Sequence, residues 1–373
     1  MLPPKSYVAF IATRRAQCVA VVDLGNFKLL ETIPLGFAPQ RISVRPHNHE
    51  LLITSEAGDI GVIRYPDQKV ITTLETGSRD TRLCFSRDGR RGYAVGADQH
   101  EIIVLAGDPP HVTQRYRFKE TISRLALTPD GKTLLAEAVR LDHLLFINTN
   151  DGRILGSLPL GENAGQMVIL PDGAKVFVAD PGENAVYAED IPARQTLSRI
   201  EMGYTPNLLA LKPDGGEIFA ISSKSSTITL LDTSSDSVEQ ALPVGANPVA
   251  AIFSADSSTA YIANAGDGTV TTLDVQNRGT VASTRIGVEP VALALTPDQR
   301  FLAVVDAGAG SVAIVRARAP MLITTIAVGS DPVDISIPGW LWKASSAVKG
   351  GRSADSQKRS SAELTINDGP AGQ

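Results

Sequence analysis

The stretch from Gly287 to Gly329, GVEPVALALTPDQRFLAVVDAGAGSVAIVRARAPMLITTIAVG, returns about every 42 residues along most of the 373-residue chain. It contains four apolar runs of strand length, PVALAL, RFLAVVD, SVAIVR and LITTIAVG, which Gly, Pro and Asp separate. Short runs rich in Val and Ile, punctuated at regular spacing, are typical of antiparallel strands. Four strands in a repeat of roughly 40 to 45 residues indicate one blade of a β-propeller.

Two features of the repeat fix its register. The turn after the first strand reads Pro129-Asp130-Gly131 or a variant, and successive turns from Pro46 to Pro297 lie 41 or 42 residues apart. Pro presets φ, Asp bonds its own backbone and Gly accepts a positive φ, so these residues make tight reversals. Each first strand follows a Gly-x-x-Pro motif or a weakened copy, as at Gly245 and Gly287, where a proline at the strand start removes no ladder donor.

The two ends of the chain complement each other. Residues 7–36 supply three strands, seven complete units follow over 37–329, and residues 332–337 supply one more first strand. Joining the ends gives an eighth blade and removes two exposed sheet edges. The sequence therefore predicts an all-β fold, an eight-bladed β-propeller of four-stranded antiparallel blades closed by the N- and C-terminal strands in one blade. Seven blades is the alternative if one unit is degenerate.

The repeat also sets the domain boundaries. We expect a single propeller domain over residues 1–342 and a disordered tail over 343–373, because the periodicity ends there and serine becomes frequent. Trp340 and Trp342 are the only tryptophans of the chain. They are expected to cap the closing blade, with docking of a partner as the alternative.

Composition excludes several classes of protein. The net charge of −5 and the pI of about 5.6 provide no basic field for nucleic acid. The sequence has no run of 18 apolar residues, so no membrane span is expected. The first residues lack the pattern of a signal peptide. No Gly-x-Ser-x-Gly motif, zinc spacing or P-loop occurs, so the sequence favours a protein without catalytic activity.

The third position of the inner strand carries the most informative pattern. From blade to blade it holds Arg41, Arg82, Arg124, Gln166, Leu208, Ala250, Ala292 and Asp334. A uniform structural role would repeat one residue type, whereas a ligand held off-centre needs different groups on different blades. Converging guanidinium groups suit a carboxylate or a phosphate. The alternative is an internal ion-pair network in which Asp80, Glu120, Glu162 and Asp334 neutralise the arginines.

Two histidines fall in loops expected at the mouth of the central channel, where function concentrates on a rigid scaffold. His100 and His143 follow the second strands of the blades that carry Arg82 and Arg124. Solvated loop histidines are the alternative interpretation. The predicted ligand-binding set is Arg41, Arg82, Arg124, Gln166, His100 and His143, with no catalytic and no metal-binding residue.

The second strands carry a family resemblance. They read Tyr261-Ile-Ala-Asn264 and, in register, Phe177-Val-Ala-Asp180, and Gly268-Thr-Val-Thr-Thr-Leu-Asp274 follows the first of these. With the Gly-x-x-Pro motif, this pattern resembles the YVTN-type β-propeller repeat family, which is similar to the eight-bladed haem-d1 propeller of cytochrome cd1 nitrite reductase. The resemblance covers about 330 residues. It implies a bacterial extracytoplasmic protein, periplasmic or secreted, although this N-terminus shows no signal peptide.

The resemblance also raises the question of a cofactor. A haem-d1 relative would need an axial imidazole for the iron and cations for the carboxylates of the macrocycle, for which His100, His143 and the arginines are the candidates. No specific motif supports haem d1, and the cofactor stays unknown.

Three functions remain open. The first is a non-catalytic binding or scaffold propeller that holds a small anionic ligand or a protein partner at the channel mouth. The second is a cofactor-handling or enzymatic propeller, haem-d1-like or lactonase-like. The third is a protein-interaction platform, which an aromatic content of 5% weakens because such a surface needs an exposed apolar patch. We expect a monomer.

Overall fold

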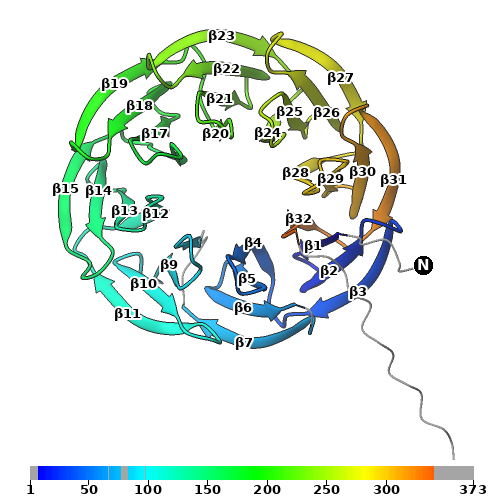
Figure 1. Ribbon diagram of the computed structural model, residues 1–373, viewed down its shortest axis with the longest axis horizontal. Helices are drawn as coiled ribbons and strands as arrows, with labels where there is room; N and C mark the ends of the chain where they lie inside the picture. The colour runs from blue at the N-terminus through cyan, green and yellow to red at the C-terminus, as the bar shows by residue number, and fades with distance from the viewer. Residues whose placement is uncertain (1–6, 66, 77–82, 97, 340–373) are drawn as a thin grey trace, which may run out of the picture. The chain divides into compact units, whose positions relative to one another are not determined.

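The computed structural model describes residues 7–65, 67–76, 83–96 and 98–339, which form eight four-stranded antiparallel sheets arranged in a ring (Figure 1). The prediction of an eight-bladed propeller is confirmed, and the seven-bladed alternative is excluded. Within the described ranges no helix is long and apolar enough to cross a lipid bilayer. Trp340, Trp342 and the tail predicted for residues 343–373 lie outside the described residues.

In each blade the strands follow one another from the axis of the ring to its rim (Figure 1). The inner strands are β32 (Pro332–Ser336), β4 (Pro39–Arg45), β8 (Cys84–Phe85), β12 (Ile122–Leu127), β16 (Met167–Ile169), β20 (Leu208–Leu211), β24 (Pro248–Phe253) and β28 (Pro290–Leu295). The second strands are β1 (Val8–Thr13), β5 (Glu50–Ser55), β9 (Arg91–Val95), β13 (Thr133–Ala138), β17 (Lys175–Asp180), β21 (Glu217–Ser222), β25 (Thr259–Asn264) and β29 (Phe301–Asp306).

The outer half of each blade has the same order. The third strands are β2 (Cys18–Asp23), β6 (Asp59–Arg64), β10 (Glu101–Ala106), β14 (His143–Asn148), β18 (Ala185–Asp190), β22 (Thr227–Asp232), β26 (Thr269–Asp274) and β30 (Ser311–Arg316). The outer strands are β3 (Lys28–Pro34), β7 (Lys69–Glu75), β11 (His111–Arg117), β15 (Ile154–Pro159), β19 (Gln195–Glu201), β23 (Ser237–Pro243), β27 (Gly279–Arg285) and β31 (Met321–Ala327). We number the blades 1 to 8, from the one that contains β1 to the one that contains β31.

Blade 1 is closed by the two ends of the repeat region. Strand β32 pairs antiparallel with β1, with Ile335 opposite Ile11 and Asp334 opposite Ala12. The backbone N–H of Arg14 also donates to the carbonyl of Asp331 at 2.8 Å. The last strand of the ring therefore pairs with the first, as the complementary ends of the sequence predicted.

The hydrophobic core is divided among the interfaces between neighbouring blades. At one interface, for example, Ala9 and Ile11 of blade 1 pack with Ala303 and Val305 of blade 8. The second and third strands are covered on both faces by adjacent blades, and they therefore read as nearly continuous apolar runs instead of alternating. This packing supplies the rigid scaffold that holds the inner strands around the axis.

Glu189 breaks the apolar pattern of the third strands. It follows the register shift caused by a bulge at Leu197 of β19. The residues at the same place in the other blades are Val22, Ile63, Leu105, Ile147, Leu231, Leu273 and Val315. The Glu189 side chain is fully buried, and neither carboxylate oxygen has a hydrogen-bond partner. Burial raises the pKa of Glu189 to about 7, and Thr196 on β19 offsets this only in part.

This carboxyl group makes stability depend on pH. The folded protein keeps the Glu189 proton up to about pH 7, whereas an unfolded glutamate releases it near pH 4.5. Since the folded state binds more protons in this window, stability falls as the pH rises through it.

Replacing Glu189 by leucine, the residue found at this position in blades 6 and 7, is therefore expected to stabilise the protein more at high pH than at low pH. The shift corresponds to an extra gain of about 3 kcal/mol in the free energy of unfolding at pH 8 relative to pH 4. Urea unfolding at both pH values measures this gain. Glu201→Leu, on the exposed outer strand of the same blade, is the control and should show no such difference. Equal gains from Glu189→Leu at both pH values would contradict the account.

Candidate functional site

A β-bulge near the start of several inner strands turns extra side chains toward the axis. In blade 2, Pro39 pairs with Ser55 and Arg41 pairs with Thr54, which leaves Gln40 as the additional residue. The same shift occurs after Pro248, Pro290 and Pro332. A bulge re-aims side chains where an unbroken strand would alternate them. Consecutive residues such as Gln40 and Arg41 therefore both line the axial cavity.

The loop before the inner strand of blade 8 is held by the end of the second strand. In blade 8 the Asp306 carboxylate accepts hydrogen bonds from the backbone N–H groups of Val288 at 3.0 Å and Glu289 at 2.9 Å. A Cβ atom on Gly287 would lie 1.7 Å from a carboxylate oxygen of Asp306, which explains the glycine of the Gly-x-x-Pro motif there. The motif thus positions the start of the inner strand.

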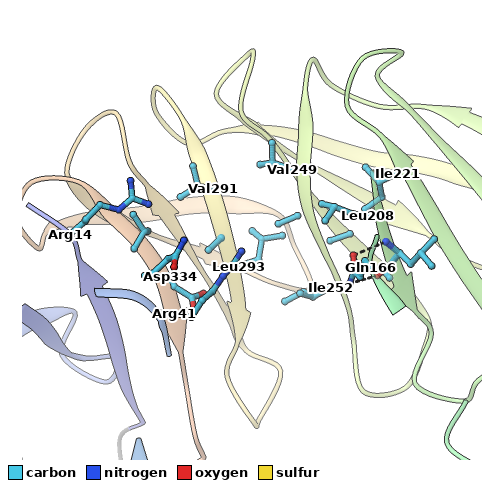
Figure 2. A pocket seen from close by; sticks show the side chains of 17 residues that line it. Arg14, Arg41, Gln166, Leu208, Ile221, Val249, Ile252, Val291, Leu293 and Asp334 are labelled. Atoms are coloured by element: carbon cyan, nitrogen blue, oxygen red, sulfur yellow. Dashed lines mark hydrogen bonds between the residues drawn. The ribbon is translucent and has the colours of Figure 1, made fainter. Parts of the chain in front are cut away.

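A cavity of about 400 Å³ is lined by residues of blades 5, 6, 7, 8, 1 and 2 (Figure 2). This volume is in the range of small-molecule sites. Six third-position residues line it: Arg41, Gln166, Leu208, Ala250, Ala292 and Asp334. The small side chains of Ala250 and Ala292 leave the space that larger residues would fill.

The cavity has a polar end and an apolar end. Figure 2 shows Arg14, Arg41 and Asp334 together at one end, and Leu208 and Ile252 toward the other. The remaining apolar lining side chains include Ile221, Val249, Val291 and Leu293. A ligand in this space would contact charged side chains at one end and mainly apolar side chains at the other.

Arg41 is the charged group of the cavity that lacks compensation. Its Nε atom is buried without a hydrogen-bond partner, and no described carboxylate lies within ion-pair distance of its guanidinium group. The adjacent Gln40 side chain has a buried Oε1 atom that is also without a partner. Buried polar groups are normally satisfied, and each one that is not costs about 1–3 kcal/mol.

Arg14 adds a second guanidinium group from the loop between β1 and β2. Its Nη1 atom lies 3.8 Å from Asp331, a distance at the limit of an ion pair, and its Nε atom is buried without a hydrogen-bond partner. Among the described residues that line the cavity there are therefore two guanidinium groups, from Arg14 and Arg41, and one carboxylate, from Asp334.

Gln166 and Asp334 bind the backbone of the next blade. The Gln166 amide donates to the carbonyl of Leu209 at 3.0 Å and accepts from the N–H of Leu209 at 2.9 Å. Asp334 accepts from the N–H of Ile42 at 2.8 Å. At these two blades the third-position side chain fastens one inner strand to its neighbour.

Arg124 is placed differently from Arg41. Its Nε atom lies 3.4 Å from a carboxylate oxygen of Glu137 on β13, to which the Ser123 hydroxyl also donates at 2.5 Å. Burial raises the pKa of Glu137, while Ser123 and Arg124 act to lower it. Arg124 does not line the axial cavity, and its partner is Glu137 of its own blade and not Glu120 or Glu162.

The two predicted histidines do not line this cavity. Arg82 and Asp80 lie outside the described residues. The Nδ1 atom of His100 lies 2.9 Å from the carbonyl oxygen of Glu120, and the Nδ1 atom of His143 contacts the carbonyl oxygen of Leu141. Both rings are thus engaged with local backbone, and neither lines the cavity.

Sequence reasoning missed Arg14 and Gln40. Arg14 lies in a loop between a second and a third strand, the class of loop that was expected at the channel mouth, so its position could have been found from the repeat. Gln40 could not, because strict alternation along β4 would turn it away from the side that Arg41 faces.

Comparison with solved structures places this architecture among known propellers. The dihydro-heme d1 dehydrogenase NirN in complex with DHE gives a TM-score of 0.78 at 12% identity, over 89% of this chain and 75% of that one. Hydrazine synthase of Kuenenia stuttgartiensis gives 0.59 at 19% identity, over 71% of this chain and 91% of that one. A functionally unknown protein of Desulfotomaculum acetoxidans gives a TM-score of 0.57 at 13% identity, over 89% of this chain and 98% of that one.

The chain has the fold of the haem-d1 propellers. At these identities the likeness shows the fold alone. No family model matches the sequence, and no curated protein matches it either. The YVTN-type repeat therefore stays a prediction from the strand motifs.

The likeness to a haem-d1 protein raises the question whether the cavity of this propeller fits a haem. Haem iron is held by His, Cys, Met or Tyr. None of these residue types is among the described residues that line the cavity. The described residues also contain no group of three or more His, Cys, Asp or Glu side chains placed to hold a metal ion. The lining does not fit a haem iron.

Arg41 and Gln166 hold the same register position in two blades, and they differ in whether their polar atoms have partners. Leucine is accepted at this position, as Leu208 of blade 6 shows, so leucine variants of both residues test the effect of that difference on stability. Arg41→Leu removes a buried donor without a partner and is expected to raise the unfolding free energy of the ligand-free protein by about 1–3 kcal/mol. Gln166→Leu leaves the N–H and the carbonyl of Leu209 unpaired and is expected to lower it by a similar amount. Chemical denaturation measures both. Destabilisation by Arg41→Leu would mean that this arginine is satisfied within the protein.

Proposed function

We propose that this propeller is a binding protein without catalytic activity that holds a small anionic ligand in the axial cavity, with Arg41 as the principal contact. The observation that carries the proposal is the guanidinium group of Arg41, whose Nε atom is buried without a hydrogen-bond partner and which has no carboxylate partner among the described residues.

A bound anion would compensate this charge. Arginine does not lose its proton in proteins, so it cannot relieve its burial by becoming neutral. A guanidinium group presents a rigid fork of donors that matches a carboxylate or a phosphate. The second guanidinium group, from Arg14, adds to the positive potential at the same end of the cavity.

The two alternative functions have less support. A haem-handling role, which the likeness to a dihydro-heme d1 dehydrogenase suggests, lacks an axial ligand among the described lining residues. A protein-interaction platform would need an apolar patch on a face of the ring. The exposed large apolar residues of the described chain belong to loops and outer strands of many blades, among them Leu29, Leu141, Leu197, Tyr204, Val281 and Val288.

Binding of an anion to the folded state is expected to raise the melting temperature, since a ligand at 100 times its Kd stabilises by about 2.7 kcal/mol. The panel is acetate, octanoate, succinate and inorganic phosphate at constant ionic strength, measured by differential scanning fluorimetry. At least one of these should stabilise the wild type, and Arg41→Gln should abolish that effect.

Arg153→Gln is the control for the loss of one positive charge. Arg153 is highly exposed, pairs with Asp151 in a turn and does not line the cavity. It should respond to the panel as the wild type does. Equal changes in melting temperature of the wild type and Arg41→Gln with every anion would contradict the proposal.

A further inference from the structure

The two ends of the axial cavity restrict the chemistry of its ligand further than charge alone. We propose that the ligand is a monocarboxylate with an unbranched or flat apolar body, held with its carboxylate at Arg41 and its body against blades 6 and 7. This inference rests on the proposed function and names the ligand class for the same site.

The charge of the lining favours a single negative charge. Among the described residues Arg14 lies 3.8 Å from Asp331, which leaves Arg41 as the guanidinium group without a carboxylate partner, so one added anionic group would balance it. The Asp334 carboxylate is already bound to the N–H of Ile42 and stays as a fixed negative charge. A phosphate dianion or a tricarboxylate would leave excess negative charge beside Asp334.

The apolar end excludes a second charge at the far side of the ligand. Leu208, Ile221, Val249 and Ile252 carry no polar side-chain atom, and the nearby Gln166 amide is occupied by the backbone of Leu209. A charged group placed there would lose part of its hydration without gaining a polar partner among these side chains, which is unfavourable. Hydrocarbon, by contrast, gains free energy when it leaves water for this wall.

The volume limits the size of the body. A space of about 400 Å³ is at the low end of the range for small-molecule sites, so it suits an acid with a short apolar body. Octanoate is therefore a suitable probe, and suberate, with a second carboxylate at the far end, is its matched control.

The test is a calorimetric titration of the whole protein with acetate, butyrate, hexanoate, octanoate and suberate. Affinity is expected to rise about two- to fourfold per added methylene from acetate to octanoate, as for burial of a CH₂ group. Suberate should bind at least tenfold more weakly than octanoate. Arg41→Gln should weaken binding of every member of the series.

A second variant tests the apolar end without removing the carboxylate contact. Ala250→Leu places at this register position the residue that blade 6 already carries as Leu208, and it fills the apolar end of the cavity. It is expected to reduce octanoate binding to the level of acetate and to leave acetate binding unchanged.

The outcomes separate this inference from the proposed function. If neither a carboxylate nor inorganic phosphate binds in a manner that depends on Arg41, the proposed function fails and the ligand class fails with it. If inorganic phosphate alone binds in that manner, the ligand class is wrong while the anion site stands. If Arg41-dependent binding is found but is equal along the series, equal for octanoate and suberate, or insensitive to Ala250→Leu, the ligand class is wrong while the anion site stands.

Discussion

The bulge that follows the first proline of the inner strand is the constraint on which the axial cavity depends. It lets two consecutive residues, such as Gln40 and Arg41, face the same side of a strand that would otherwise alternate. The loop before it is held in place by the second strand, as Asp306 holds the backbone of Val288 and Glu289. The apolar interfaces between blades keep this geometry rigid, and sequence variation at one register position then decides what the axis presents.

Glu189 and Arg41, which both have buried polar atoms without a hydrogen-bond partner, differ in how they respond to burial. Glu189 sits at an interface between blades where the other blades carry apolar residues, and burial raises its pKa to about 7, so the group becomes neutral at mildly acidic pH. Arg41 cannot become neutral in this way, because a guanidinium group keeps its proton. It also borders a cavity, which Glu189 does not. A group that stays charged and faces open space is suited to an external counter-ion, and proteins commonly accept a loss of stability at functional positions.

The repeat made the fold and the axial register predictable, because each blade restates the same strand and turn signals and the two chain ends complement each other. Third-position residues were thereby expected at the channel, and Arg41 and Gln166 do line it. Side-chain partners were not predictable. The pairing of Arg124 with Glu137 depends on a register shift between Ile122 and Leu125, and the hydrogen bonds of Gln166 to Leu209 depend on the distance between two blades. Neither of these contacts can be predicted from a single sequence.

The most direct measurement is a crystal structure of the protein soaked with 4-iodobenzoate, a monocarboxylate whose iodine is located by anomalous scattering. The account predicts an anomalous peak at the apolar end of the axial cavity, near Leu208 and Ile252, with the carboxylate bound to the guanidinium group of Arg41. Iodine beside Arg41, a cavity without the acid, or an Arg41 side chain paired with a carboxylate of the protein would contradict it.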